Sequence, residues 1–160
     1  MTTNAAATAR KNRILLVAMA RSSYLAADAL GQMHLSYPAE VYIIKTLYPG
    51  ILPSYFYTDS FAKGIDGIII AAAGADCPIE ASYKQLSENV SKAHAFMTEK
   101  GMNVKRLRLT AICSVCTNAL SGIFKPFVDH AHCYPTFNEI RYQPFTGENN
   151  TQNTHIPILI

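Results

Sequence analysis

Four apolar runs of strand length alternate with longer segments of helical character, and this alternation constrains the fold more than any other feature. The runs are residues 13–20, 41–47, 67–70 and 106–113. Continuous apolar runs rich in branched residues are typical of strands that are buried on both faces of a sheet. Each connection is long enough for a helix, so consecutive strands are predicted to run parallel in right-handed βαβ units.

The clearest helix signal lies between the third and fourth runs. Its apolar residues are spaced four, three and four apart, at Leu86, Val90, Ala93 and Met97. Glycines at Gly64 and Gly101 are well placed to end the second and third helices. The pattern therefore predicts an α/β fold, a single domain with a mainly parallel four-stranded sheet covered by helices, layered as in flavodoxin-like and Rossmann-like proteins.

The first and last helices have weaker signals. For the first helix, the expected apolar face consists of Leu25, Ala29 and Met33. The last helix, around residues 119–131, is expected to be poor because Gly122 and Pro126 interrupt it.

Length and composition fit one domain with extensions. The chain has 160 residues, of which 49% are apolar and 16% charged, enough for one real core. We predict a flexible N-terminal segment at residues 1–12, the α/β domain at residues 13–131, and an extended C-terminal arm at residues 132–160. The arm combines a polar run with the apolar end Ile156 to Ile160, which predicts that it lies on another subunit.

The charge pattern and the cysteines narrow the class of protein. The net charge of +3 is spread along the chain without interleaved aromatic residues, so no nucleic-acid partner is expected. No run approaches the ~18 apolar residues of a membrane span, and the first residues lack the core of a secretory signal. We therefore expect a cytoplasmic location, where the four cysteines are free thiols or ligands rather than disulfides.

In a parallel sheet, the loops after the strands gather at one edge, and ligands bind there. Here these loops are residues 19–23, 48–51, 71–78 and 114–118. None of them contains a glycine-rich phosphate-binding motif, so a nucleotide site is not indicated.

Five blocks of the chain carry a resemblance to a known family. They read RILLVAMARSSYLAADALG, YPAEVYIIKTLYPG, FAKGIDGIII, EASYK and VKRLRLTAI. In order and spacing they resemble the delta subunit of methyl-viologen-reducing hydrogenase, over residues 13–128. The resemblance implies an electron-transfer module that carries a [2Fe-2S] cluster and docks on a heterodisulfide-reductase-like flavin and iron-sulfur subunit.

The chain departs from the family at the cluster ligands. Where the family has a Cys-x-x-Cys pair after the first strand, this chain has Met19 and Ser22. Tyr48 replaces a cysteine after the second strand, and after the third strand alanines up to Ala73 precede Cys77 in a shortened loop. Since a [2Fe-2S] cluster needs four thiolates, or two thiolates and two histidines, we expect that the family cluster has been lost and that no cofactor is bound.

The alternative is a rebuilt [2Fe-2S] cluster or metal site. The spacing of Cys113 and Cys116 would let two sulfurs bind one metal, and Cys77 would come from the neighbouring loop. The fourth ligand would be Cys133, His130 or His132.

Two other interpretations of the Cys-x-x-Cys pair remain. Cys113, at the end of a strand, is expected to be a core residue, because free cysteine is among the most buried residue types. A redox-active dithiol is disfavoured, because such a pair is activated at a helix N-terminus and the helix that follows is weak.

The remaining polar residues have structural interpretations. His34 is expected late in the first helix, and His94 is expected to be exposed or hydrogen-bonded. Ser22 and Ser23 are interpreted as helix caps, and residues 48–57, rich in tyrosine, as a packed loop or an interface.

Taken as a whole, the sequence predicts a non-catalytic docking subunit of a cytoplasmic electron-transfer complex, whose main partner is a heterodisulfide-reductase-like flavin and iron-sulfur subunit. The alternative is an electron-transfer subunit that carries its cluster on relocated cysteines. No constellation of residues supports an unrelated enzyme.

Overall fold

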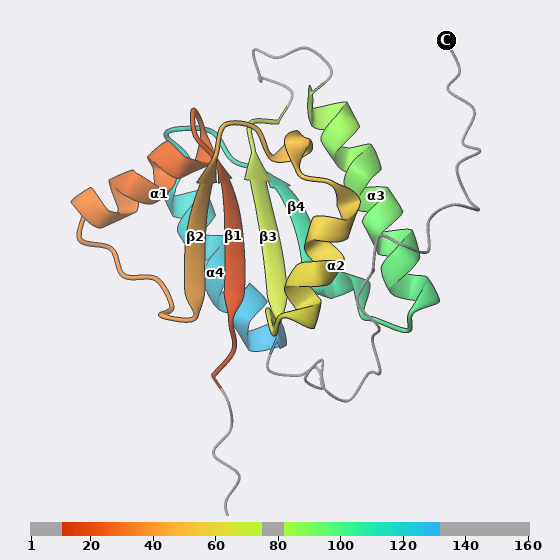
Figure 1. Cartoon of the computed structure of the whole chain (residues 1–160). Coiled ribbons are helices and arrows are strands. Elements are labelled where there is room, and N and C mark those ends of the chain that lie inside the picture. Colours follow the sequence, from red (N-terminus) through yellow and green to blue (C-terminus); the bar gives the residue numbers. More distant parts are fainter. Residues whose placement is uncertain (1–10, 75–81, 132–160) are drawn as a thin grey trace, which may run out of the picture.

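Four parallel strands form a sheet with the order β2-β1-β3-β4 (Figure 1). The computed structural model describes residues 11–74 and 82–131. The strands are β1 (Ile14–Met19), β2 (Val41–Thr46), β3 (Gly67–Ala72) and β4 (Leu107–Ala111). The predicted α/β fold with its parallel four-stranded sheet is thus confirmed.

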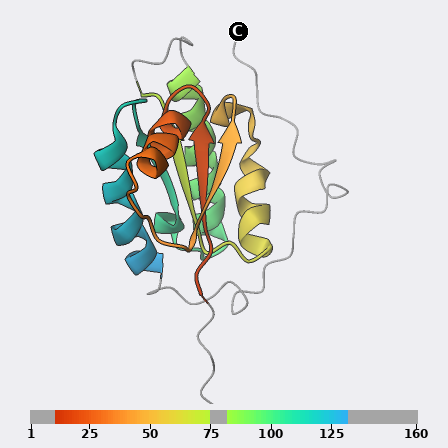
Figure 2. The ribbon, with the colours of Figure 1, turned by 90° about the vertical axis from the view of Figure 1, so that its left-hand side faces the viewer.

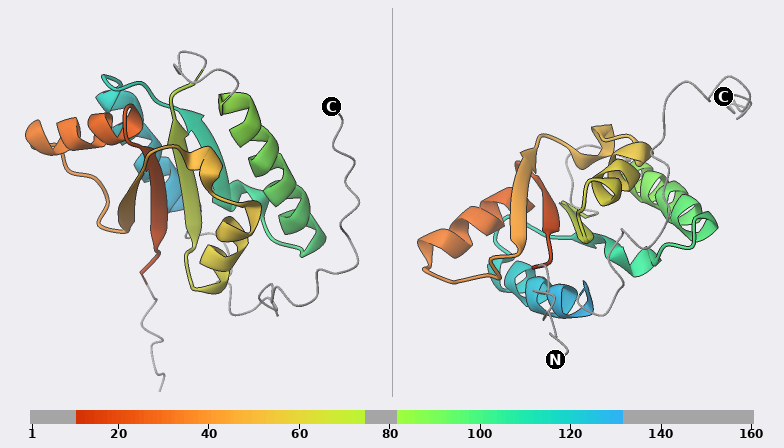
Figure 3. Two further views of the ribbon diagram at one scale, coloured as in Figure 1. Left: turned by 45° about the horizontal axis from the view of Figure 1, so that its top comes forward. Right: turned by 60° about the horizontal axis from the view of Figure 1, so that its bottom comes forward.

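Helices cover both faces of the sheet. They are α1 (Ser23–Gln32), α2 (Ser54–Ala62), α3 (Ser82–Glu99) and α4 (Thr117–Ala131), with short 3-10 turns η1 (Pro49–Ile51) and η2 (Val104–Arg106). Helices α1 and α4 lie on one face, and α2 and α3 on the other (Figures 2 and 3). Each pair encloses its own apolar cluster, so the sheet separates two halves of the core.

Strand β3 is the most buried element of the sheet. All six of its residues are buried, and it lies between β1 and β4. The strand continues through Ala71 and Ala72, which were predicted to lie in the following loop. That prediction was wrong because Ala71 pairs with Ala18 and Thr110, and small side chains fit beneath the covering helices.

Helix α1 packs through a different face from the one predicted. Its buried apolar residues are Ala26, Ala27 and Leu30, whereas Leu25 is 48% exposed and Met33 is 56% exposed. The predicted apolar face was chosen from the larger apolar side chains, Leu25 and Met33. The alanines instead let the helix approach the sheet and α4 closely, so burial follows fit rather than size.

Helix α4 is continuous over fifteen residues, although the sequence suggested an interrupted helix. Gly122 and Pro126 both lie inside it. Its inward face packs against the sheet through five apolar side chains: Leu120, Phe124, Phe127, Val128 and Ala131. The free energy gained by this packing outweighs the low helix propensity of Gly122 and Pro126, since most helix stability in proteins comes from tertiary contacts.

A buried ion pair between Arg106 and Asp66 lies at the amino ends of β1, β3 and β4. Arg106 Nε donates to the carbonyl oxygen of Asp66 at 2.7 Å, and the carboxylate of Asp66 accepts the Arg13 N–H at 2.9 Å. The side chains of Arg106 and Asp66 are only 3% and 5% exposed. This cluster fixes the starts of β1, β3 and β4 relative to one another.

Within residues 11–74 and 82–131, no helix is both long enough and apolar enough to cross a membrane. The predicted C-terminal arm, residues 132–160, lies outside the described residues, as do residues 1–10 of the predicted N-terminal segment.

Candidate functional site

The carboxyl ends of all four strands meet at one edge of the sheet, as predicted (Figure 1). Backbone hydrogen bonds hold the neighbouring loops together there. Ala20 N–H donates to the Thr46 carbonyl at 2.8 Å, and Ile112 N–H donates to the Ala72 carbonyl, also at 2.8 Å. The positions that correspond to the family's cluster ligands therefore lie on adjacent loops.

The loop after β1 is closed by backbone and hydroxyl contacts. Met19 is 2% exposed and Ser22 is 4% exposed, and Ser22 N–H donates to the Met19 carbonyl at 3.1 Å. Ser22 precedes α1 but makes no side-chain cap, and its hydroxyl has no hydrogen-bond partner among the described residues. Ser23 Oγ accepts from Met19 N–H and donates to the Ala71 carbonyl. Ser22 thus occupies the N-cap position of α1, as expected, although its side chain makes no cap. The interpretation of Ser23 as a cap was wrong, because Ser23 lies inside α1 and links β1 to β3.

Tyrosines fill the region after β2. Tyr48 is half-buried, and its ring lies so close to Gly50 that a Cβ at position 50 would collide with it. Tyr57 of α2 is fully buried, and its hydroxyl has no partner among the described residues. Burial and, secondarily, Tyr48 raise the pKa of Tyr57 to about 12. The phenol of Tyr57 thus stays neutral at physiological pH.

The loop after β3 leaves the sheet in contact with the end of β4. Ala73 is partly buried against the core on the side of α2 and α3. A Cβ at Gly74 would lie 2.8 Å from the Cβ of Ala111. The loops after β3 and β4 are therefore neighbours, as the rebuilt-site alternative requires. Cys77 itself lies outside the described residues.

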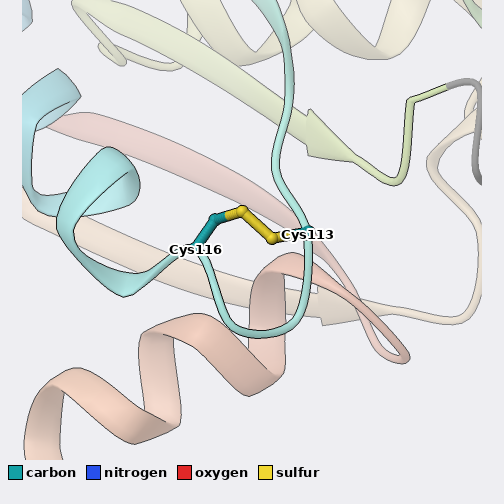
Figure 4. Close-up of a disulfide and its surroundings, with 2 residues drawn as sticks. All are labelled: Cys113 and Cys116. Carbon is teal, nitrogen blue, oxygen red and sulfur yellow. A yellow bond between two sulfur atoms is a disulfide. The ribbon is translucent and has the colours of Figure 1, made fainter.

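Cys113 and Cys116 form a disulfide in the loop between β4 and α4 (Figure 4). The expectation that these two residues are not joined by a disulfide was therefore wrong, whereas their role as metal ligands stays a prediction. Cys116 N–H donates to the Cys113 carbonyl at 3.2 Å, and this turn brings the two Cα atoms to 5.1 Å, within disulfide range. Cys113 is half-buried rather than a core residue, because it lies beyond the end of β4.

The described residues do not fit a [2Fe-2S] cluster at the family position. Met19, Ser22, Tyr48 and Ala73 offer a thioether, a hydroxyl, a phenol and a methyl group, and the cluster requires thiolates. No three His, Cys, Asp or Glu side chains within residues 11–74 and 82–131 gather in a metal-binding arrangement.

His130 lies too far from Cys116 to be a ligand of the rebuilt site. His130 lies in the last turn of α4 and Cys116 precedes its first turn, so about 20 Å of helix separates them. The ring of His130 contacts the Pro126 carbonyl at 2.6 Å instead. The suggestion that His130 is a fourth ligand was therefore wrong. His132 and Cys133 lie outside the described residues.

The other histidines have structural roles or positions. His94 Nε2 lies 2.9 Å from the Leu107 carbonyl, which confirms the expected hydrogen bond. His34 lies beyond the end of α1 with a φ of 55°, not inside the helix as expected.

The sequence-based interpretations of Ser23 as a helix cap and of residues 48–57 as a packed loop or an interface missed the roles of two residues at this edge, Ser23 and Tyr57. Ser23 bonds to a carbonyl 48 residues away, and no local signal reports such a contact. Tyr57 could have been found, because it lies four residues before Phe61 and both side chains form the inward face of α2.

An exposed apolar surface adjoins the same edge. Strand β2 lies at the border of the sheet, and none of the described helices covers its face on the side of α2 and α3 (Figures 1 and 3). We call this region, together with the exposed residues that follow β2, the β2 surface: Tyr42, Ile44, Leu47, Ile51 and Tyr55. Tyr42 is 55% exposed and Leu47 is 73% exposed.

Comparisons with known proteins agree with the resemblance. The model of the family described as methyl-viologen-reducing hydrogenase, delta subunit, matches residues 14–132. A protein of Archaeoglobus profundus, named as an iron-sulfur subunit of F420-non-reducing hydrogenase, is 31% identical over 98 residues, which cover 60% of this chain and 71% of that protein. The family match takes in every strand and helix described above.

Proposed function

Because the chain belongs to the methyl-viologen-reducing hydrogenase delta-subunit family, we propose that it is a docking subunit of a cytoplasmic electron-transfer complex. Its partner in this proposal is a heterodisulfide-reductase-like flavin and iron-sulfur subunit. The subunit positions redox-active neighbours and does not itself carry electrons between them.

One observation supports the proposed loss of the electron-carrier role. The loops that correspond to the family's cluster present Met19, Ser22, Tyr48 and Ala73, and none of these side chains is a thiolate. Met19 and Ser22 are also buried in contacts that close the loop after β1. A cluster at this place would need both new ligands and a reopened loop.

The β2 surface supports the docking role. A strand at the border of a sheet offers unpaired backbone groups, and apolar side chains beside it favour association with another protein. Tyrosine is among the residue types enriched in the centres of protein interfaces. We propose that the flavin and iron-sulfur subunit covers Tyr42 and its neighbours.

A pair of matched variants tests this docking. Tyr42→Lys changes the β2 surface, whereas Met33→Lys changes a residue on the other side of the sheet with nearly the same exposure, 55% against 56%. Each variant is produced together with the partner subunit, and the dissociation constant is measured by titration. We expect Tyr42→Lys to weaken binding at least about tenfold, or roughly 1.4 kcal/mol, and Met33→Lys to leave it unchanged. Equal affinities of both variants and the unchanged chain would exclude the β2 surface as the docking site.

The second candidate function is an electron-transfer subunit with a [2Fe-2S] cluster on relocated cysteines. The contact between Gly74 and Ala111 favours it, since it places the loop that leads to Cys77 beside the loop that leads to Cys113. This candidate requires that the disulfide open and that further ligands come from outside the described residues. Iron and sulfide analysis of the chain distinguishes it from the docking role.

A further inference from the structure

We propose that Cys113 and Cys116 form a reversible redox site that exchanges two electrons with a dithiol reductant. This site goes beyond the docking role and does not depend on it. It needs neither the family's cluster nor the partner subunit.

The disulfide lies where a reductant can reach it. The loop from Cys113 to Cys116 projects between the end of β4 and the start of α4 (Figure 4). Both cysteines are half-buried, and the two residues between them are exposed, with Val115 at 85%. Thiol–disulfide exchange requires that the attacking sulfur approach one sulfur of the bond, and an exposed loop permits this approach.

The bond contributes little to holding the fold together. Only three positions of sequence separate the two cysteines, so the bond closes a very short loop and removes little entropy from the unfolded chain. Both ends of the loop are already fixed, by the hydrogen bond from Ile112 to Ala72 and by the burial of Leu120. The bond can therefore open without loss of the surrounding structure.

The start of α4 favours release of one particular sulfur. Cys116 immediately precedes the first residue of this fifteen-residue helix, and its carbonyl accepts the Leu120 N–H at 3.0 Å. The N-terminus of a helix stabilises a thiolate. Residues 112–124 contain no charged side chain, so no carboxylate within this segment opposes that effect. The continuous α4 removes the objection that the following helix is too weak to activate the pair.

The exchange proceeds in two steps. A thiolate of the reductant attacks Cys113 Sγ, the bond between the two cysteine sulfurs breaks, and Cys116 leaves as the thiolate. The second thiol of the reductant then attacks its own sulfur in the mixed disulfide and releases Cys113. The reductant loses two electrons and becomes a disulfide, and its two protons end on Cys113 and Cys116.

A redox titration of the full chain tests the proposal. The protein is equilibrated anaerobically with mixtures of reduced and oxidised dithiothreitol, quenched with acid and alkylated, and the free thiols are counted and located by mass spectrometry. We expect Cys113 and Cys116 to gain and lose their thiols together in one two-electron transition, while circular dichroism shows an unchanged fold.

Two variants serve as controls. The combined Cys77→Ser and Cys133→Ser variant should keep the transition, and Cys116→Ser should abolish it. In the reduced chain, iodoacetamide at about pH 7 should label Cys116 faster than Cys113, which a merely structural bond does not predict. The proposal is overturned if the two thiols stay reduced in fully oxidised dithiothreitol. It is equally overturned if the bond opens only when the protein unfolds.

A further comparison identifies the source of the dithiol. A thioredoxin-class protein is used in place of dithiothreitol, with the unchanged chain and with Val115→Asp. If Val115→Asp slows reduction by the protein several-fold and not by dithiothreitol, the site takes a protein dithiol that docks on Val115. If both reductants act alike on both chains, the site takes small dithiols. Failure of both reductants on the folded chain overturns the proposal.

Discussion

The hydroxyl of Ser23 joins the loop after β1 to the end of β3. It donates a hydrogen bond to the Ala71 carbonyl at 2.6 Å and accepts one from Met19 N–H at 2.9 Å. Ser23 is completely buried, so no water replaces these partners from the surface. One small side chain thus holds the centre of the carboxyl edge together.

We expect Ser23→Ala to lower the free energy of unfolding by about 1–3 kcal/mol, because two buried backbone groups lose their partner. Ser22→Ala is the matched control, since Ser22 is also buried but its hydroxyl has no partner among the described residues. Urea denaturation of both variants measures the difference. A cost as large for Ser22→Ala would show that the Ser23 hydrogen bonds are not the cause.

The buried pair of Asp66 and Arg106 predicts a larger effect. Asp66→Ala removes the carboxylate that lies 4.0 Å from Arg106 Nη2 and accepts the Arg13 N–H. We expect a loss of about 3 kcal/mol, because the buried Arg106 loses its interaction with the Asp66 carboxylate. The Lys11–Glu40 pair is the control, since Lys11 is 63% exposed and Lys11→Ala should cost less than about 1 kcal/mol. Similar midpoints for the two variants in denaturant would contradict this expectation.

These contacts show where sequence reasoning succeeds in the fold and where it fails. The number and the parallel direction of the strands follow from apolar runs and connection lengths, which are local properties. The buried face of α1 does not follow from local properties. Ala26 and Leu30 are buried because they fit against α4 and the sheet, while the larger Leu25 and Met33 are exposed. The continuity of α4 across Pro126 likewise depends on tertiary packing that local propensity does not contain.

The cofactor prediction is tested on the isolated chain. Purified under strictly anaerobic conditions, the chain should contain little iron and should lack the visible absorption of a [2Fe-2S] centre, because the ligand positions in the described loops carry no thiolates. About two irons and two sulfides per chain would contradict the docking proposal and favour the relocated cluster. Cys77, Cys113 and Cys116 would then be the ligands to replace.

The cysteine pair allows a separate test in the assembled complex. Replacing Cys113 and Cys116 together by serine should leave electron transfer nearly intact, since a docking subunit is not a relay. Unfolding should become easier by no more than about 1–3 kcal/mol through lost packing. Electron transfer is followed with the complex's own donor and acceptor. A variant that folds and assembles normally but stops electron flow would place the pair on the electron path.

Truncation tests the predicted C-terminal arm, which lies outside the described residues. Deleting the chain from Pro144 onward removes none of the described core contacts, so we expect the α/β domain to stay folded by circular dichroism. Binding to the partner subunit should weaken, because the removed residues include the apolar end. Unfolding of the truncated chain, with an intact chain that is a stable monomer, would assign the arm to the core.

The sequence predicts which residues lie at the candidate site, but it does not predict the chemical state of the two cysteines. The sequence names the residues on each loop, and the parallel sheet brings these loops to one edge, so the positions of Met19 and Tyr48 could be anticipated. Whether Cys113 and Cys116 bind a metal, remain thiols or bond to each other depends on the turn between them. That turn is set by the backbone hydrogen bond from Cys116 to Cys113, which the spacing alone does not specify.

The β2 surface also has a consequence for the amount of this chain that a cell can make without its proposed partner. Strand β2 at the border of the sheet, with the exposed Tyr42 and Leu47 beside it, can also associate with a second copy of the chain. Under the docking proposal, copies made in excess of the proposed partner would therefore aggregate or be degraded by proteases. The docking proposal therefore favours synthesis of this chain and its proposed partner in matched amounts.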